Sequence, residues 1–182
     1  MNQAITIEEL EKRMRPGAWS KGGFLGSTES LQAIMFQDEL TLHQLGITYQ
    51  QIGNTLQKIL SAMHERYWER RDRWRDRIEL LDTQTIPSFS LDNLPALEDG
   101  FLYGNIQVFF TQWRGFQECP WECQTDPTWG SFDFLLLNRR LGEFVTGPSL
   151  IVHLIRKHRF FEGLESPYRS DPAKLIRILE LT

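Results

Sequence analysis

The stretch Leu102-Tyr-Gly-Asn-Ile-Gln-Val-Phe-Phe-Thr-Gln-Trp113 marks a change in the periodicity of the chain. Within it Ile106, Val108 and Phe110 alternate with Gln107, Phe109 and Thr111. A period of two is typical of a β-strand, so we expect a strand from about Leu102 to Trp113. Because the preceding residues show helical spacing instead, this switch decides the fold class as α+β.

The residues after this strand predict more strands and then helices. A second strand fits residues 132–138, and Arg139-Arg-Leu-Gly142 turns the chain toward a short third strand at 143–146. Pro148 suits the first turn of a helix that reaches about Phe161 and is stopped by Gly163. Asp171 caps a terminal helix over 172–181. The order predicts a small antiparallel sheet followed by C-terminal helices.

The first part of the chain reads as helices. The pairs Thr6-x-x-Glu9 and Thr48-x-x-Gln51 are capping boxes, which open helices ending near Arg15 and Leu81. Between them, apolar residues at helical spacing predict a helix over about 31–45 that is ended by Gly46. The apolar faces of these helices predict a core that includes Leu31, Ile34, Leu45, Ile52, Leu56 and Leu60.

These elements suggest a helical lobe over residues 1–81, a linker over 82–101, and a β-β-(β)-α-α lobe over 102–182. The linker is proposed because Pro87 and Pro95 lie there among Ser, Thr, Asp and Asn residues. A chain of 182 residues is long enough to bury one core without disulfides, so we expect the two lobes to form one compact domain.

Composition narrows the functional class. With 20 basic and 24 acidic residues the net charge is -4, and neither half of the chain is a basic nucleic-acid arm. No apolar run reaches the ~20 residues that span a membrane, and the charged start lacks the apolar core of a signal peptide. We therefore expect a cytoplasmic protein that does not act in a membrane. Two cysteines exclude a disulfide-rich scaffold but allow a metal site.

Both cysteines lie in the segment Cys119-Pro-Trp-Glu-Cys123, which we call the knuckle, and His153 and His158 share the predicted helix after the strands. The pattern is Cys-x3-Cys, 29 intervening residues, and His-x4-His. Zinc favours four thiolate and imidazole ligands in a tetrahedron, and these short spacings are typical of paired ligands. The four residues are therefore candidate zinc ligands.

Through these four residues, the segment of about 102–161 resembles the C2H2 zinc-finger family. The resemblance implies a ββα zinc-finger-like element with a closed, structural, tetrahedral zinc site. Fingers of that family have about twelve residues between the two pairs, whereas this chain has 29, so the DNA-reading positions of the family are not carried over. The tail from His153 to Pro172 resembles bacterial proteins of unassigned function, which implies no mechanism.

A helical wheel supplies the alternative to a zinc site. At 100° per residue His158 falls in the middle of the apolar face and His153 at its edge, 140° away. On this alternative His158 is a core histidine, His153 an edge histidine, and the cysteines are buried thiols. A zinc site requires a loosened last turn of the helix. A redox disulfide is the third interpretation, although catalytic thiol pairs usually have two intervening residues.

Residues 42–56 resemble a helix-turn-helix segment, with Gly46 at the turn. The resemblance implies a DNA-binding regulator in which Tyr49, Gln50 and Asn54 face the major groove. Arg156, Lys157 and Arg159 would then contact phosphates. The reading helix lacks Arg or Lys before Lys58, although phosphate neutralisation supplies much of the affinity of such proteins. An ordinary helical hairpin is therefore favoured for this segment.

The leading hypothesis from the sequence is a non-enzymatic, zinc-stabilised protein that acts through an interaction surface, with a protein partner or a second copy of the chain. The DNA-binding regulator is the alternative. A metal-dependent hydrolase, whose metal is held by fewer than four of the named residues, is the third hypothesis.

Overall fold

The computed structural model describes residues 5–79, 100–113, 115, 117–123 and 131–181, without the side chains of 70–79. It confirms the α+β class, because the described residues form five α-helices and one four-stranded antiparallel sheet. The elements, in chain order, are α1 (Ile7–Met14), α2 (Leu31–Leu45), α3 (Tyr49–Glu79), β1 (Phe101–Tyr103), β2 (Ile106–Gln112), β3 (Phe132–Asn138), β4 (Glu143–Pro148), α4 (Leu150–His158) and α5 (Pro172–Ile178).

The predicted helix starts in the first half of the chain are confirmed. Thr6 and Glu9 form both hydrogen bonds of a capping box in front of α1. At the start of α3, the backbone N–H of Gln51 donates to Thr48 Oγ1 at 3.2 Å, and Gln51 Oε1 accepts from the Thr48 N–H at 2.9 Å. Gly46 ends α2 in the left-handed conformation, with φ of 67°. Local sequence therefore fixes where these helices begin and where α2 ends.

The sheet corrects one predicted strand. The expected single strand at 102–113 is two strands, β1 and β2, joined by a two-residue turn at Gly104-Asn105. Gly104 has a φ of 59°, which a two-residue hairpin turn of this kind requires and glycine adopts without strain. Strand β3 matches the prediction, and β4 continues two residues beyond Thr146 to Pro148. The strand order is β1-β2-β3-β4.

The C-terminal helices are shorter than predicted. Ser149 is the N-cap of α4, and Pro148 belongs to β4 instead of the first helical turn. Helix α4 ends at His158, before Gly163, because Arg159 adopts the left-handed conformation and its N–H bonds to carbonyls of the last turn. Asp171 caps α5 as predicted, but this helix ends at Ile178.

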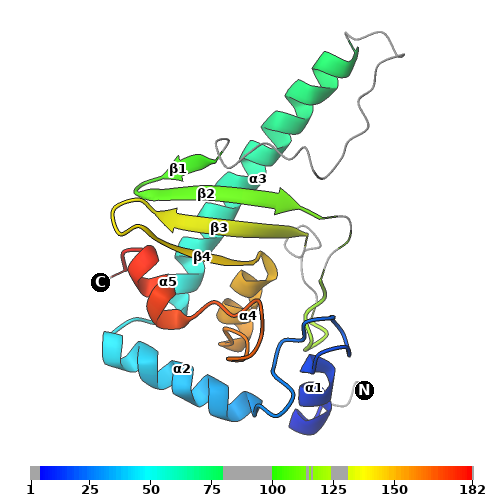
Figure 1. Cartoon of the computed structure of the whole chain (residues 1–182), viewed down its shortest axis with the longest axis vertical. Helices are drawn as coiled ribbons and strands as arrows, with labels where there is room; N and C mark the ends of the chain where they lie inside the picture. The colour runs from blue at the N-terminus through cyan, green and yellow to red at the C-terminus, as the bar shows by residue number, and fades with distance from the viewer. Residues whose placement is uncertain (1–4, 80–99, 114, 116, 124–130, 182) are drawn as a thin grey trace.

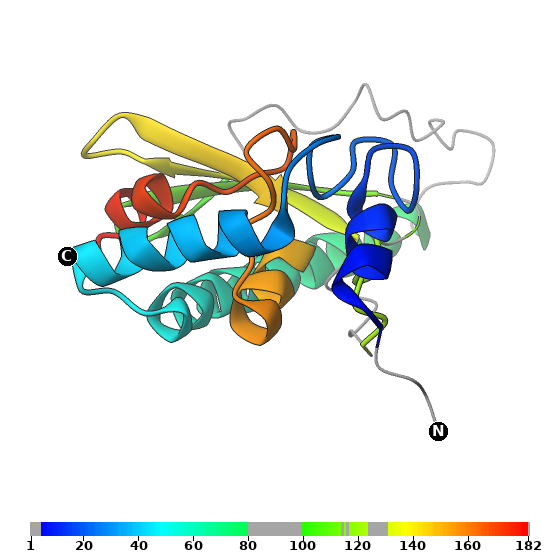
Figure 2. The ribbon, with the colours of Figure 1, turned by 90° about the horizontal axis from the view of Figure 1, so that it is seen from below.

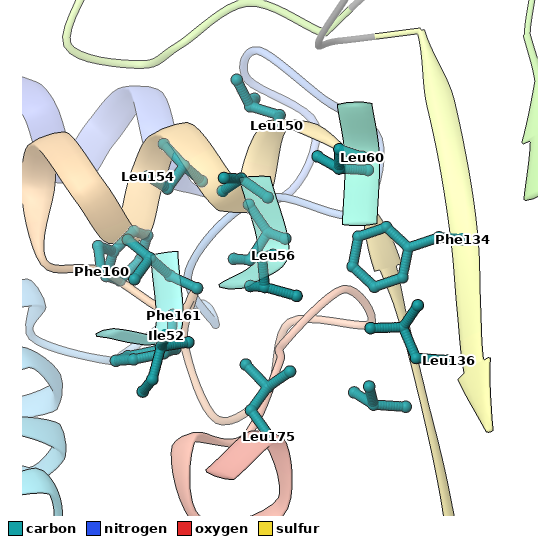
Figure 3. Packing of buried hydrophobic residues seen from close by; sticks show 14 of the residues in the cluster. Ile52, Leu56, Leu60, Phe134, Leu136, Leu150, Leu154, Phe160, Phe161 and Leu175 are labelled. Carbon is teal, nitrogen blue, oxygen red and sulfur yellow. The ribbon is translucent and has the colours of Figure 1, made fainter. Parts of the chain in front are cut away.

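The core lies between the sheet and the helices. Helix α3 packs against α4 and crosses the sheet at β2, while α5 packs against β3, β4 and α2 (Figure 1). Helices α2, α3 and α4 lie on the same side of the sheet (Figure 2). Figure 3 shows the side chains that meet there, among them Leu56 and Leu60 of α3, Leu154 of α4 and Phe134 of β3.

The structure differs from the sequence-based expectation at Leu45 and at the end of the predicted linker. Leu45, predicted for the core, is 42% exposed at the end of α2, whereas the other five predicted core residues are buried. Most of the predicted linker, residues 82–99, lies outside the described residues. Phe101, at its C-terminal end, is the first residue of β1.

Candidate metal centre

The knuckle lies beyond the end of β2, between α4 and α1 (Figure 1). Its turn is closed by the N–H of Glu122, which donates to the Cys119 carbonyl at 2.8 Å, with Pro120 at the second position of the turn. Cys119 is 1% exposed and Cys123 is half-buried. The turn therefore directs both thiols toward the interior side of the segment.

Helix α4 supplies the two imidazoles. His153 lies in the middle of the helix and His158 is its last residue. Both side chains are half-buried, although the helical wheel places His158 in the middle of the apolar face and His153 at its edge. Arg159 leaves the helical conformation directly after His158, so the His158 ring lies at the end of the helix.

The four side chains converge on one point. The Nε2 atoms of His153 and His158 lie 2.9 and 3.2 Å from Cys123 Sγ, and His158 Nε2 lies 3.4 Å from Cys119 Sγ. The two Sγ atoms are 3.3 Å apart, and all four ligand atoms lie within 4.8 Å of one another. Zinc bonds of about 2.3 Å to sulfur and about 2.0 Å to nitrogen separate tetrahedral ligands by roughly 3.3–3.8 Å. The measured separations of 2.9–3.4 Å lie at or slightly below this range, so the cluster is compatible with a metal ion once the ligands move apart by a few tenths of an ångström.

Both histidines of the cluster are in the protonation state that binds a metal ion. Burial, followed by the charges of His153 and Lys157, lowers the pKa of His158 to about 4. Burial and the neighbouring cations of α4 also lower the pKa of His153. Both imidazoles are thus neutral at neutral pH, which is the form that binds metals.

The Cys119 thiol shows the opposite situation. Burial and the hydrogen bond shared with the Cys123 thiol raise its pKa to about 12, although the backbone N–H groups of Trp121 and Cys123 act in the other direction. A thiolate is the metal ligand, so in the absence of a cation this site holds its proton. Metal binding is therefore expected to release a proton from Cys119.

The knuckle is also joined to the first helix of the chain. Arg13 of α1 forms an ion pair with Glu122 at 2.9 Å, and its guanidinium lies 5.2 Å from the centre of the Trp19 ring. This ion pair could not be predicted from the sequence, because a charge in a loop carries no signal of a partner more than a hundred residues away. A metal in the knuckle would thus be surrounded by segments from three parts of the chain.

The helix-turn-helix segment makes different contacts from those that the resemblance implies. The Tyr49 ring stacks on Phe161 at 5.7 Å and carries the Arg159 guanidinium at 5.8 Å, so it is engaged within the chain. Gln50 and Asn54 are exposed and hydrogen-bonded to each other at 3.2 Å. The main helical partners of α2 and α3 are α5 and α4 respectively.

A buried polar cluster lies away from the cysteines. Arg169 forms an ion pair with Asp38 of α2 at 2.5 Å, and it also donates to the backbone carbonyl of Glu162. Asp171, two residues after Arg169, instead caps α5. Its carboxylate accepts the N–H of Lys174, as the capping pattern predicts.

The Glu162 carboxyl group is fully buried. Ser166 Oγ donates to Glu162 Oε2 at 2.5 Å, and Glu162 Oε1 has no hydrogen-bond partner among the described residues. Burial raises the pKa of Glu162 to about 8. This carboxyl group is therefore mostly protonated at neutral pH.

The described part of the chain includes no helix both long and apolar enough to cross a membrane. Comparison with protein-family models, with curated proteins and with solved structures finds no match.

Proposed function

We propose that the chain is a non-enzymatic, zinc-stabilised protein that acts through an interaction surface. The observation that carries the zinc part is the convergence of Cys119, Cys123, His153 and His158, whose ligand atoms lie within 4.8 Å of one another. Two thiolates and two imidazoles form a donor set that zinc prefers in structural sites.

The donor set also supports a structural role for the metal. With four protein ligands, a tetrahedral zinc ion has no open position for a substrate or a reactive water molecule. The ion would instead join the knuckle that follows β2 to α4, across the 29 residues between Cys123 and His153. Because the unfolded chain does not hold the ligands together, the binding free energy becomes folding free energy.

The interaction surface that we propose is the outer sheet face, defined as Leu102, Phe109, Leu135, Leu137 and Phe144. Leu102, Gln107, Leu137 and Phe144 are cross-strand neighbours in one row, and Phe109 and Leu135 face each other in the next. Leu102 is 57% and Phe144 50% exposed. Phe109, Leu135 and Leu137 are half-buried. The solvent face of an antiparallel sheet is usually polar, so apolar side chains that remain partly exposed there favour an interaction site.

A second copy of the chain is the partner that we propose for the outer sheet face. Apolar sheet faces pack against other sheet faces at about 10 Å, as in a β-sandwich. A two-fold contact requires the same patch on both molecules, and one such face per chain supplies it. Among the described elements, helices α2, α3 and α4 lie on the opposite side of the sheet (Figure 2).

Elemental analysis of the purified protein tests the zinc part of the proposal. We expect one equivalent of zinc per chain, lost in Cys119→Ser and Cys123→Ser. His43→Ala is the matched control, because His43 lies exposed on α2, away from the cluster. A wild-type protein without metal, and with unchanged thermal stability when zinc is added, would contradict a structural zinc site.

Sedimentation analysis tests the interaction part. Phe144→Ser should shift the protein toward monomer. Phe36→Ser, which changes another exposed phenylalanine on α2, should not. Equal sedimentation of both variants and the wild type would contradict the outer sheet face as a dimer contact.

A salt titration of nucleic-acid binding tests the alternative function, a DNA-binding regulator. Counterion release gives a steep dependence of affinity on salt only for such a regulator.

A further inference from the structure

Trp121 lies in the knuckle between the two cysteines and stacks on one of the candidate ligands. Its ring and the His158 ring are nearly parallel, with an interplanar angle of 5° and 4.0 Å between the ring centres. The Trp121 ring also makes an edge-to-face contact with Phe160, at 5.7 Å and 69°, and Phe160 is fully buried. The indole is therefore fixed against the core on one side and against the imidazole on the other.

The position of His158 explains why such a contact matters. His158 is the last residue of α4, and Arg159 turns the backbone into the left-handed region with φ of 55°. A helical side chain is directed back toward the preceding turn, and because the chain leaves the helix after His158, the ring meets Trp121 of the knuckle instead of a following turn. His153, in contrast, has helical residues on both sides.

The stack of Trp121 on His158 also orients the imidazole toward the two thiols. On a regular helix the two histidines point 140° apart, yet both Nε2 atoms lie within 3.2 Å of Cys123 Sγ. The two imidazoles meet at 5.2 Å in a T-shaped contact, so they approach the sulfur from different directions. A flat surface against the His158 ring keeps its Nε2 atom facing both thiols.

We infer that Trp121 is a positioning residue of the metal site, which orients the His158 ring and covers it from solvent. Hydrogen-bonded groups that orient metal-ligating histidines typically raise metal affinity by 10–100-fold, and we expect a stacked ring that fixes the imidazole to act in the same range. This inference rests on the proposed zinc centre. It adds that the knuckle supplies the two thiols together with the support of an imidazole from another element.

A cobalt titration followed by absorption tests the inference, because Co²⁺ reports ligand geometry and accepts the donors that zinc prefers. Trp121→Phe retains a flat ring, and Trp121→Leu retains apolar volume without one. We expect Trp121→Leu to weaken Co²⁺ binding by about 10–100-fold and to alter the spectrum. Trp121→Phe should stay close to the wild type. The unfolding of the chelated proteins, measured in parallel, reports any general loss of packing.

A double-mutant cycle shows whether Trp121 acts through His158. In a His158→Ala background, Trp121→Leu should cause little further loss of Co²⁺ affinity. In a His153→Ala background the loss should be retained, because the supported imidazole is still present. Equal losses in both backgrounds, or an unchanged affinity in Trp121→Leu alone, would overturn the inference.

The outcome of the same titration separates this inference from the proposed function. If the wild-type protein binds neither zinc nor Co²⁺, the zinc centre itself is wrong. If the wild type binds the metal and Trp121→Leu binds it equally well, the zinc centre stands and only the role of Trp121 is rejected.

Discussion

Two residues beside the candidate ligands adopt backbone conformations that are rare for their type. Glu122, directly before Cys123, and Arg159, directly after His158, both have φ of 55°. Such left-handed conformations in residues other than glycine cost on the order of 1–3 kcal/mol each. They turn the chain sharply at the knuckle and at the end of α4, and so bring the ligands together. A metal bond at each site would offset this strain.

His153→Ala isolates the metal contribution of one ligand. Because the His153 ring is half-buried and lies beside the knuckle, its removal should weaken zinc binding by more than about 100-fold, beyond the loss typical of residues that only support a ligand. The stability of the chelated protein should change little. Chelator competition and denaturation with chelator present measure the two effects. Zinc affinity equal to that of the wild type would remove His153 from the ligand set.

Glu162→Gln tests the buried carboxyl group. Since the pKa of Glu162 rises from 4.5 to about 8 on folding, the folded state retains a proton that the unfolded state loses. The contribution of Glu162 to the free energy of unfolding should therefore be greatest below pH 4.5, fall as the pH rises toward 8, and then level off. The variant should lose this component of the pH dependence. Denaturation of the two chelated proteins between pH 5 and 9 compares them, and parallel curves would contradict the buried proton.

At the scale of the elements, helix ends in the first half of the chain follow from local signals. The capping boxes at Thr6 and Thr48 and the glycine at position 46 each act over three or four residues, so the sequence alone locates them. Helix α4 was less predictable. Its end depends on the left-handed conformation of Arg159, which no glycine signals, while Phe160 and Phe161 continue the apolar pattern into buried loop residues.

Leu56→Ala measures the contribution of α3 to the core. Leu56 is 1% exposed, and a large-to-small change at such a site should reduce the free energy of unfolding by ~2–5 kcal/mol. Leu45→Ala is the matched control, because this leucine at the end of α2 is largely exposed and should cost much less. Urea denaturation of both variants provides the comparison. Equal losses of stability would contradict the burial of Leu56 or the exposure of Leu45.

At the scale of the whole molecule, the convergence of the site could be predicted only in part. The order and spacing of the cysteines and histidines indicated the four residues, and the structure brings them together. A helical wheel could not show that the four residues converge, because it gives the directions of side chains within one regular helix and not the positions of neighbouring elements. Trp121, Arg13 and the pairing of Asp38 with Arg169 were beyond local patterns, since each depends on contacts between distant segments.

Removal of the metal should loosen the junction between the knuckle and α4. We expect a chelator to lower the melting temperature of the wild-type protein, because the free energy of zinc binding is coupled to folding. The chelator should leave Cys119→Ser unchanged, since this variant has already lost a ligand. Calorimetry with and without chelator measures both. A wild-type melting temperature that does not respond to the chelator would argue against a stabilising metal.

X-ray absorption at the zinc edge of the purified protein tests the central claim most directly. A site formed by Cys119, Cys123, His153 and His158 predicts two sulfur neighbours at about 2.3 Å and two nitrogen neighbours at about 2.0 Å. A shell of oxygen or nitrogen atoms without sulfur, or the absence of zinc from the protein, would contradict it.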